Sequence, residues 1–227
     1  MTPTHNDNPT DVTPICTVVI MIVCIWAYFW QMTLGVGGFT QVIYALGLIP
    51  GMLTGHAALP ESLDLIAPPW TLVTSIFLHG SFLYLCGNVL YLWVFATKVE
   101  AALGHGRFVA FFLFCAACAA LVQTVVSPHS LVPMVGVGGA VSGVLGAYLL
   151  LHARTRMLVT LPLGTTLAPL RIGAGRLLAL WFVVQIVSSF LSDPAVPGVA
   201  WYAHIGGFVV DTILTPFLKR PSVPLLQ

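Results

Sequence analysis

Charged side chains are scarce in this sequence: 8 Lys and Arg and 7 Asp and Glu stand against 58% hydrophobic residues in a chain of 227. A soluble domain carries roughly a quarter charged residues, so the 7% found here does not cover a water-facing surface. The formal net charge of +1 supplies no basic patch that would bind a nucleic acid. These absences exclude a soluble enzyme, a disordered chain and a nucleic-acid-binding protein, and they indicate an integral membrane protein in contact with the lipid bilayer.

Cysteine gives no sign of disulfide or metal chemistry. All five cysteines lie in apolar segments: Cys16, Cys24, Cys86, Cys115 and Cys118. The last two form a C-x-x-C pair, but no second pair of ligands is near them in sequence, so small packing residues are the better interpretation. We therefore expect no disulfide, no metal and no other cofactor.

Six apolar runs are long enough to cross the ~30 Å hydrocarbon core as helices. They cover residues 15–34, 70–96, 108–126, 135–151, 177–191 and 199–218. Residues 35–69 contain several prolines and predict an extracytoplasmic loop with one or two short helices in the membrane interface. The polar residues 1–14 predict a disordered tail, and residues 219–227 form a short C-terminal tail. The expected fold is an all-α bundle of six transmembrane helices over residues 15–218.

The positive charges give this bundle an orientation. With six spans, all eight Lys and Arg fall on one face, and Glu61, Asp64 and Asp193 fall on the other. The positive-inside rule makes the first face cytoplasmic, so both termini are expected inside the cell. Because the chain shows no cytosolic domain and no organelle-targeting segment, a bacterial-type plasma membrane is the expected location.

Polar groups gather in three of the apolar runs, where their burial is costly and makes them candidates for function. The second run contains "HGSFLYLCGN", the fourth "VGVGGAVSGVLGAY" and the sixth "AHIGGFVVD". Small residues four apart, such as Gly139 and Gly143, predict close contact between helices. Because the fourth and sixth runs cross in the same direction, we expect their outer ends to bring Gly138 and His204 into one polar pocket.

These segments resemble four motifs of the rhomboid intramembrane serine proteases, in matching order over residues 70–218. The second run is similar to the second-helix pattern His-x4-His-x3-Asn, and "KVEAALGHGRF" after it resembles a loop that carries a glutamate, here Glu100. The fourth run resembles the nucleophile helix. The sixth resembles the histidine helix, Ala-His-x-x-Gly-x-x-x-Gly, in which Gly207 is the first glycine.

In that family, a serine in Gly-x-Ser-Gly attacks the peptide carbonyl, the sixth-helix histidine is its general base, and a histidine and an asparagine of the second helix bind the oxyanion. The resemblance makes His204 the base and Asn88 the oxyanion-binding amide, with Gly136 and Gly139 as the motif glycines. Gly138 stands where the nucleophilic serine belongs, and it offers no oxygen for an acyl-enzyme.

Two other positions depart from the family pattern. Tyr84 replaces the second histidine of the motif that begins at His79, and Asp211 replaces the last glycine of the sixth-helix motif. Tyr84 is expected to fill the vacated space. A buried carboxylate at Asp211 must be protonated or paired, so we expect a hydrogen bond to the Ser142 hydroxyl, with a position near the cytoplasmic interface as the alternative. Ser142 lies one turn, ~6 Å, beyond Gly138 and is a poor substitute nucleophile.

Three functions are compatible with these residues. The first, favoured because three motif positions are lost, is a pseudoprotease that binds transmembrane helices of client membrane proteins without cleaving them. The second is an active intramembrane serine endopeptidase, either with a displaced nucleophile such as Ser142 or an activated water, or as an engineered Ser-to-Gly variant. The third, a channel or transporter, is disfavoured because only His204 and Asp211 offer ionisable groups inside the membrane. The sequence does not indicate an oligomeric state.

Overall fold

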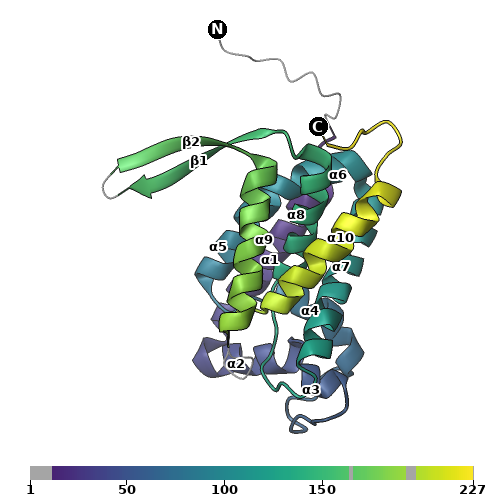
Figure 1. Cartoon of the computed structure of the whole chain (residues 1–227). Coiled ribbons are helices and arrows are strands. Elements are labelled where there is room, and N and C mark those ends of the chain that lie inside the picture. The colour runs from purple at the N-terminus through teal and green to yellow at the C-terminus, as the bar shows by residue number, and fades with distance from the viewer. Residues whose placement is uncertain (1–11, 164–165, 193–197, 227) are drawn as a thin grey trace.

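The computed structural model describes residues 12–163, 166–192 and 198–226, with the backbone alone over 159–170. It is a bundle of long helices packed alongside one another (Figure 1). The long helices are α1 (Ile15–Thr33), α7 (His105–Val126), α8 (Gly138–His152), α9 (Ala174–Leu191) and α10 (Trp201–Leu218). Most of the expected N-terminal tail, residues 1–11, lies outside the described residues, as does Asp193.

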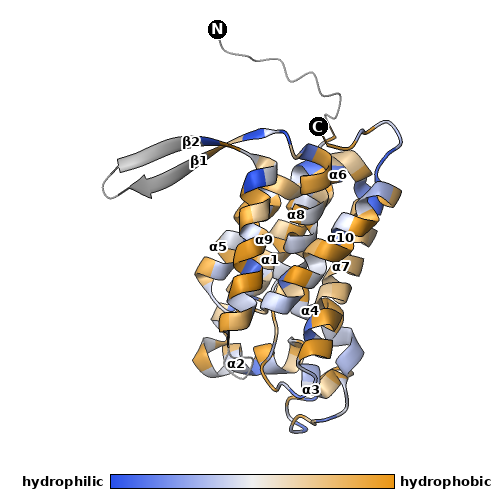
Figure 2. Cartoon of the chain, in the orientation of Figure 1, coloured by the Kyte–Doolittle hydropathy of each residue, from blue (hydrophilic) through white to orange (hydrophobic). Residues whose placement is uncertain are grey.

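Four helical stretches are long and apolar enough to cross a membrane: α1, residues Phe82–Leu103, α7 and α9. Helix α8 is shorter, and α10 carries an aspartate near its middle. Apolar residues predominate along the long helices (Figure 2), and their side chains include many exposed ones as well as those of the core. Trp26, Val125 and Phe190, for example, are more than half exposed. This surface is that of an integral membrane protein, because lipid, unlike water, accommodates an apolar exterior of this extent.

The second apolar run, 70–96, is not the single helix that we expected. It contains α4 (Thr71–Phe77) and α5 (Phe82–Tyr91), and a π-helical segment, η2 (Leu92–Ala96), joins α5 to α6 (Thr97–Leu103). The chain leaves the helix between these two parts because Ser81 caps α5, its Oγ accepting a hydrogen bond from the Tyr84 amide (3.3 Å). The His79 amide in the break donates to Gln31 Oε1 on α1 (3.1 Å). A contact from another helix therefore holds the interruption.

Residues 35–69 contain α2 (Gly35–Leu46) and α3 (Pro50–Leu53), and a 3-10 turn, η1 (Pro68–Trp70), begins at their end. Helices α2 and α3 lie at one end of the bundle (Figure 1). Backbone hydrogen bonds from Leu48 to Met134 (3.0 Å) and from Gly51 to Ser130 (2.9 Å) attach this segment to the loop that precedes α8. Its place in the membrane interface stays a prediction.

The all-helical expectation misses a β-hairpin between α8 and α9. Strand β1 (Arg156–Leu163) pairs antiparallel with β2 (Thr166–Gly173). The hairpin extends sideways from the end of the bundle that carries α6 and the C-terminus (Figure 1). Each strand is too short to be predicted as a membrane span. A search for long apolar runs does not detect two short strands that pair with each other.

Helix α8 lies at the centre of the bundle, with 11 of its 15 residues buried, and α10 packs closely along it. A Cβ on Gly207 of α10 would collide with the Gly139 carbonyl oxygen, and one on Gly146 would collide with the Phe208 carbonyl oxygen. The small residues therefore permit a backbone-to-backbone approach that larger side chains would prevent. The contact predicted between the fourth and sixth apolar runs is confirmed.

Candidate functional site

The site lies at the N-terminal end of α8, where Gly138 is the first helical residue. Gly136, two residues earlier, has a φ of +101°, a left-handed conformation that favours glycine. Its amide donates to the Ser75 carbonyl in α4 (2.8 Å), which fixes this turn. Gly138 consequently lies between Tyr84 on α5 and His204 on α10.

Gly138 has no room for a side chain. A Cβ at this position would meet Tyr84 Oη first and would lie 2.6 Å from His204 Nε2. Both approaches are well inside van der Waals contact, so a serine here would require Tyr84 or His204 to move. The prediction that Tyr84 fills the vacated space is confirmed, and its hydroxyl lies where a nucleophile's Cβ would be.

His204 is held by Gln185, a buried residue of α9 that the sequence analysis did not single out. The Nδ1 atom of His204 lies 2.8 Å from Gln185 Oε1. An amide oxygen only accepts hydrogen bonds, so this contact assigns the proton to Nδ1 and leaves Nε2 as an acceptor facing Gly138. Trp181 and Trp201 pack near the imidazole, with ring centroids 6.2 and 6.1 Å away. The signal for Gln185 was a lone amide in the apolar run 177–191.

Asn88 and His79 complete the polar group around Tyr84. The Tyr84 hydroxyl lies beside the Asn88 side chain and the Gly138 backbone, and the His79 ring lies 5.6 Å from the Tyr84 ring. The structure gives His79 Nδ1 one contact, 3.2 Å from the Phe77 carbonyl oxygen. Among the described residues, His79 Nε2 and Asn88 Nδ2 are buried without a hydrogen-bond partner. The site thus keeps polar atoms without partners close to Tyr84 and Gly138.

The expected hydrogen bond between Asp211 and Ser142 is wrong. The Ser142 hydroxyl donates instead to the Gly138 carbonyl oxygen in the preceding turn of α8 (2.8 Å), as helical serines commonly do. Asp211 is fully buried against Gly143, which also contradicts the alternative of a carboxylate reaching the interface. Within the described part of the chain, neither carboxylate oxygen of Asp211 has a partner.

Two hollows adjoin the site. A cavity of about 490 Å³ is lined by Tyr44 on α2, by residues of the loop before α8 and by the start of α10, and Tyr84 borders it. A second pocket, of about 20 Å³, lies against Gly139 and His204. That volume holds about one water molecule and is too small for a peptide group. Ser142 lines neither hollow and is 1% exposed, so it is not placed to attack a substrate.

Glu100 does not belong to this site. It lies in α6, at the opposite end of the bundle from α2 and α3 (Figure 1). Its carboxylate accepts hydrogen bonds from the amides of Cys16 and Thr17 in the first turn of α1. The segment expected as a loop is therefore largely helical, and Glu100 fastens α1 to it.

The fold and the site together define a helical membrane protein with an internal polar site around a histidine. Residues 67–221 match the Rhomboid domain family, and the chain belongs to the rhomboid family. It is 30% identical over 153 residues to the rhomboid protease GluP of Bacillus subtilis (strain 168), and 30% identical over 154 residues to RHOMBOID-like protein 5 of Arabidopsis thaliana. Each alignment covers 67% of this chain but only 27% and 45% of the respective relatives, so the chain spans less than half the length of either.

Proposed function

We propose that the protein is a rhomboid pseudoprotease that binds transmembrane segments of client membrane proteins without cleaving them. The observation that carries this proposal is the closed nucleophile position. Gly138 supplies no attacking atom, and Tyr84 Oη and His204 Nε2 occupy the space that a side chain would need. Serine-protease chemistry requires a hydroxyl that forms the acyl-enzyme bond and a pocket that admits the peptide carbonyl. Gly138 has no hydroxyl, and the pocket of about 20 Å³ is too small for a peptide group.

The larger cavity supports a binding role. Its volume of about 490 Å³ is typical of ligand pockets, which span about 300–1,000 Å³. Its lining combines apolar groups with Gln123, Ser130 and Tyr202, which offer hydrogen bonds to a partly unwound segment of a client helix. Such groups matter in a membrane, because an unwound backbone there needs partners inside the protein.

An active endopeptidase is the second candidate, and one observation favours it. His204 keeps the tautomer of a general base next to a pocket of about one water molecule. An activated water, rather than Ser142, is the displaced nucleophile that this geometry favours. An engineered Ser-to-Gly variant is less consistent with the site, because Tyr84 has closed the space as well.

We also propose that six helices cross a bacterial-type plasma membrane, with both termini in the cytoplasm. Helix α8, with 15 residues, is about 22 Å long, shorter than the ~30 Å hydrocarbon core. A helix this short supports an arrangement in which its first residue, Gly138, lies below the outer membrane surface. The 490 Å³ cavity then lies above Gly138, on the side of that surface.

Cleavage and binding in liposomes test the proposed function together. A generic rhomboid transmembrane substrate is mixed with the parent protein, with Gly138→Ser, and with Gly138→Ser combined with Tyr84→His. We expect no cleavage by the parent or by Gly138→Ser, and cleavage by the double variant. Cleavage by the parent that disappears in His204→Ala would overturn the pseudoprotease in favour of the active enzyme.

Binding is measured with a photocrosslinking phenylalanine analogue. It is placed at Tyr202, which lines the cavity, or at Phe217, an 80% exposed residue of the same helix as a matched control. We expect the parent to crosslink the substrate from Tyr202 more strongly than from Phe217. Equal crosslinking from both positions would contradict client binding in the cavity.

A further inference from the structure

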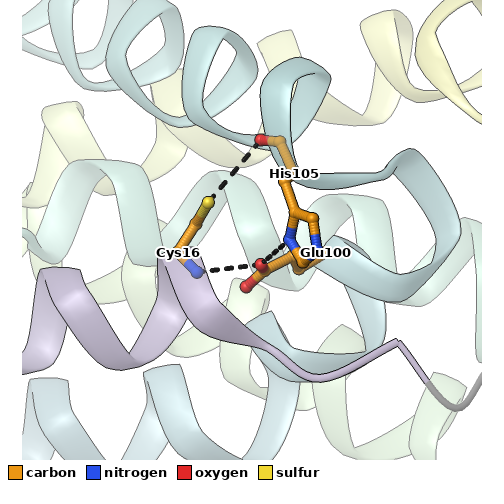
Figure 3. A group of neighbouring side chains, drawn as sticks. All are labelled: Cys16, Glu100 and His105. Atoms are coloured by element: carbon orange, nitrogen blue, oxygen red, sulfur yellow. Dashed lines mark hydrogen bonds and ion pairs between the residues drawn. The ribbon is translucent and has the colours of Figure 1, made fainter.

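We propose that Cys16, Glu100 and His105 form a binding site for a divalent transition metal of the Zn²⁺ type. The three residues lie together (Figure 3), at the end of the bundle that carries α6 (Figure 1). They come from the first turn of α1, from α6 and from the first residue of α7. The proposal is independent of whether the protein cleaves or binds clients.

The geometry brings one donor atom from each residue to the same place. The Cys16 sulfur, a Glu100 carboxylate oxygen and a His105 ring nitrogen all lie within 4.8 Å of one another. Figure 3 shows the three side chains close together on separate segments, with the Cys16 sulfur turned toward the His105 carbonyl oxygen. Tetrahedral zinc, with bonds of about 2.0–2.3 Å, separates its ligand atoms by roughly 3.5 Å. Reaching that spacing requires side-chain rotations that open the 2.6 Å contact between His105 and Glu100 and close the wider separations.

The donor set selects the class of metal. A thiolate and an imidazole favour Zn²⁺ and Co²⁺, whereas Mg²⁺ and Ca²⁺ prefer sites made entirely of oxygen. Three protein ligands leave a fourth position for water. Binding displaces the thiol proton and takes a nitrogen of neutral imidazole, so the site exchanges protons for metal.

Glu100 is already oriented by its surroundings. The Thr17 amide and hydroxyl donate to Oε2 at 2.8 and 2.6 Å, and the Cys16 amide donates to Oε1 at 2.9 Å. These bonds fix the carboxylate as outer-shell partners fix ligands in known metal sites. Oε1 is the oxygen that faces His105, whose Nδ1 lies 2.6 Å from it.

The side chains of the other two donors, His105 and Cys16, are less firmly held than Glu100 and have room to move when a metal binds. The His105 side chain is 42% exposed, which provides both an entry path and room for the ring to turn. The Cys16 thiol makes a weak contact with the His105 carbonyl oxygen at 3.9 Å. A metal would replace this contact and the His105–Glu100 contact, and would join α1 to α7 directly.

A hydrogen-bonded helix cap without metal is the competing explanation, and spectroscopy separates the two. The purified full chain in detergent micelles is titrated with Co²⁺ and, in competition with a chromophoric chelator, with Zn²⁺. Cys16→Ser and His105→Ala remove one donor each, and both leave the backbone amides that bind Glu100. Cys118→Ser and His129→Ala are the matched controls, because neither residue belongs to the cluster.

We expect the parent to show a near-ultraviolet thiolate-to-Co²⁺ band that Cys16→Ser abolishes and both controls retain. Zn²⁺ affinity should fall by about tenfold or more in Cys16→Ser and in His105→Ala. Zn²⁺ should also raise the melting temperature of the parent and not that of these two variants. A band that persists in Cys16→Ser, Zn²⁺ affinity unchanged in His105→Ala, or no metal response in the parent would overturn the proposal.

Discussion

At the scale of single residues, Gly138, which stands at the family's nucleophile position, has neighbours that also depart from the family pattern. Two replaced motif residues each contact a glycine of α8: Tyr84 lies at Gly138, and Asp211 lies at Gly143. A single inactivating substitution would leave the original pocket open. Here Tyr84 and Asp211 instead pack against the two glycines, which is consistent with the pseudoprotease proposed above.

The closed position at Gly138 makes a prediction about stability. Gly138→Ala should lower the free energy of unfolding by about 1–3 kcal/mol, because the new methyl group overpacks the site against Tyr84 and His204. Combining it with Tyr84→Phe, which removes the nearest atom, should recover part of that loss. Thermal unfolding of both single variants and the double variant in detergent gives the interaction free energy between positions 84 and 138.

Gly87 provides the control for that comparison. It lies inside α5, where an added Cβ would meet nothing within 4 Å. Gly87→Ala should be neutral or stabilise the protein by up to about 1 kcal/mol, since alanine favours helix more than glycine does. If Gly138→Ala proved as stable as Gly87→Ala, the nucleophile position would not be closed.

Asp211 makes a second prediction at this scale. Its carboxyl group is buried with no partner among the described residues, so the folded state bears the cost of desolvating it. The isosteric Asp211→Asn is cheaper to bury than a carboxylate, so we expect stability to be unchanged or raised by up to about 1–3 kcal/mol. Thermal unfolding measures this, with the exposed Asp64→Asn as the control. A clear loss of stability in Asp211→Asn alone would mean that the carboxyl group has a role that its surroundings do not reveal.

At the scale of elements, α1 depends on another helix for its first turn. Its N-cap residue, Pro14, makes no side-chain hydrogen bond. The free amides of Cys16 and Thr17 are satisfied by Glu100 of α6 instead. Without such a partner, these groups would need water at the helix end. Glu100 therefore both caps α1 and fixes its position in the bundle.

We expect Glu100→Gln to loosen this end of α1. The substitution replaces charge-assisted hydrogen bonds with weaker ones and one misplaced donor, so a loss of about 1–3 kcal/mol is expected. Amide hydrogen exchange at Cys16 and Thr17 should accelerate, with a chelator present so that no metal contributes. The exposed Glu61→Gln should change neither quantity. Unchanged exchange in Glu100→Gln would show that α1 is held by packing alone.

At the scale of the whole molecule, helices were easier to predict than the contacts between them. The observed starts of α1, α7, α8, α9 and α10 lie within three residues of those expected, because long apolar runs dominate the local signal. The interruption around His79 was missed because Gln31 of another helix holds it. The hairpin was missed because its stability comes from strand pairing.

The site shows the same difference between features of one segment, which were predicted, and contacts between helices, which were not. Gly138, Tyr84 and His204 were predicted from motifs and do lie together. Gln185 and the Cys16–Glu100–His105 cluster were not predicted. Their contacts join residues on different helices, as in the Cys16 amide bond to Glu100, 84 positions away, and a residue-by-residue pattern does not encode such pairs.

The helix ends that lie together indicate how the bundle is oriented in the membrane. The Arg220 amide donates to the Ala102 carbonyl (3.0 Å), and the Leu226 amide donates to the Leu150 carbonyl (2.7 Å). These contacts place the ends of α6, α8 and α10 together, and Glu100 adds the start of α1. Segments rich in Lys and Arg flank these ends, so the positive-inside rule predicts that this end of the bundle is cytoplasmic.

Reporter fusions test this arrangement. A fluorescent protein fused after residue 227 should fluoresce, and alkaline phosphatase at the same position should be inactive, because both report a cytoplasmic C-terminus. Fusions after Ser130, in the loop between α7 and α8, should give the opposite pair of results. If both positions reported the same side, α8, α9 and α10 would not make the expected three crossings. If the C-terminal fusions themselves reported the outside, the basic residues around the C-terminus would face the outside, against the charge bias that orients membrane helices.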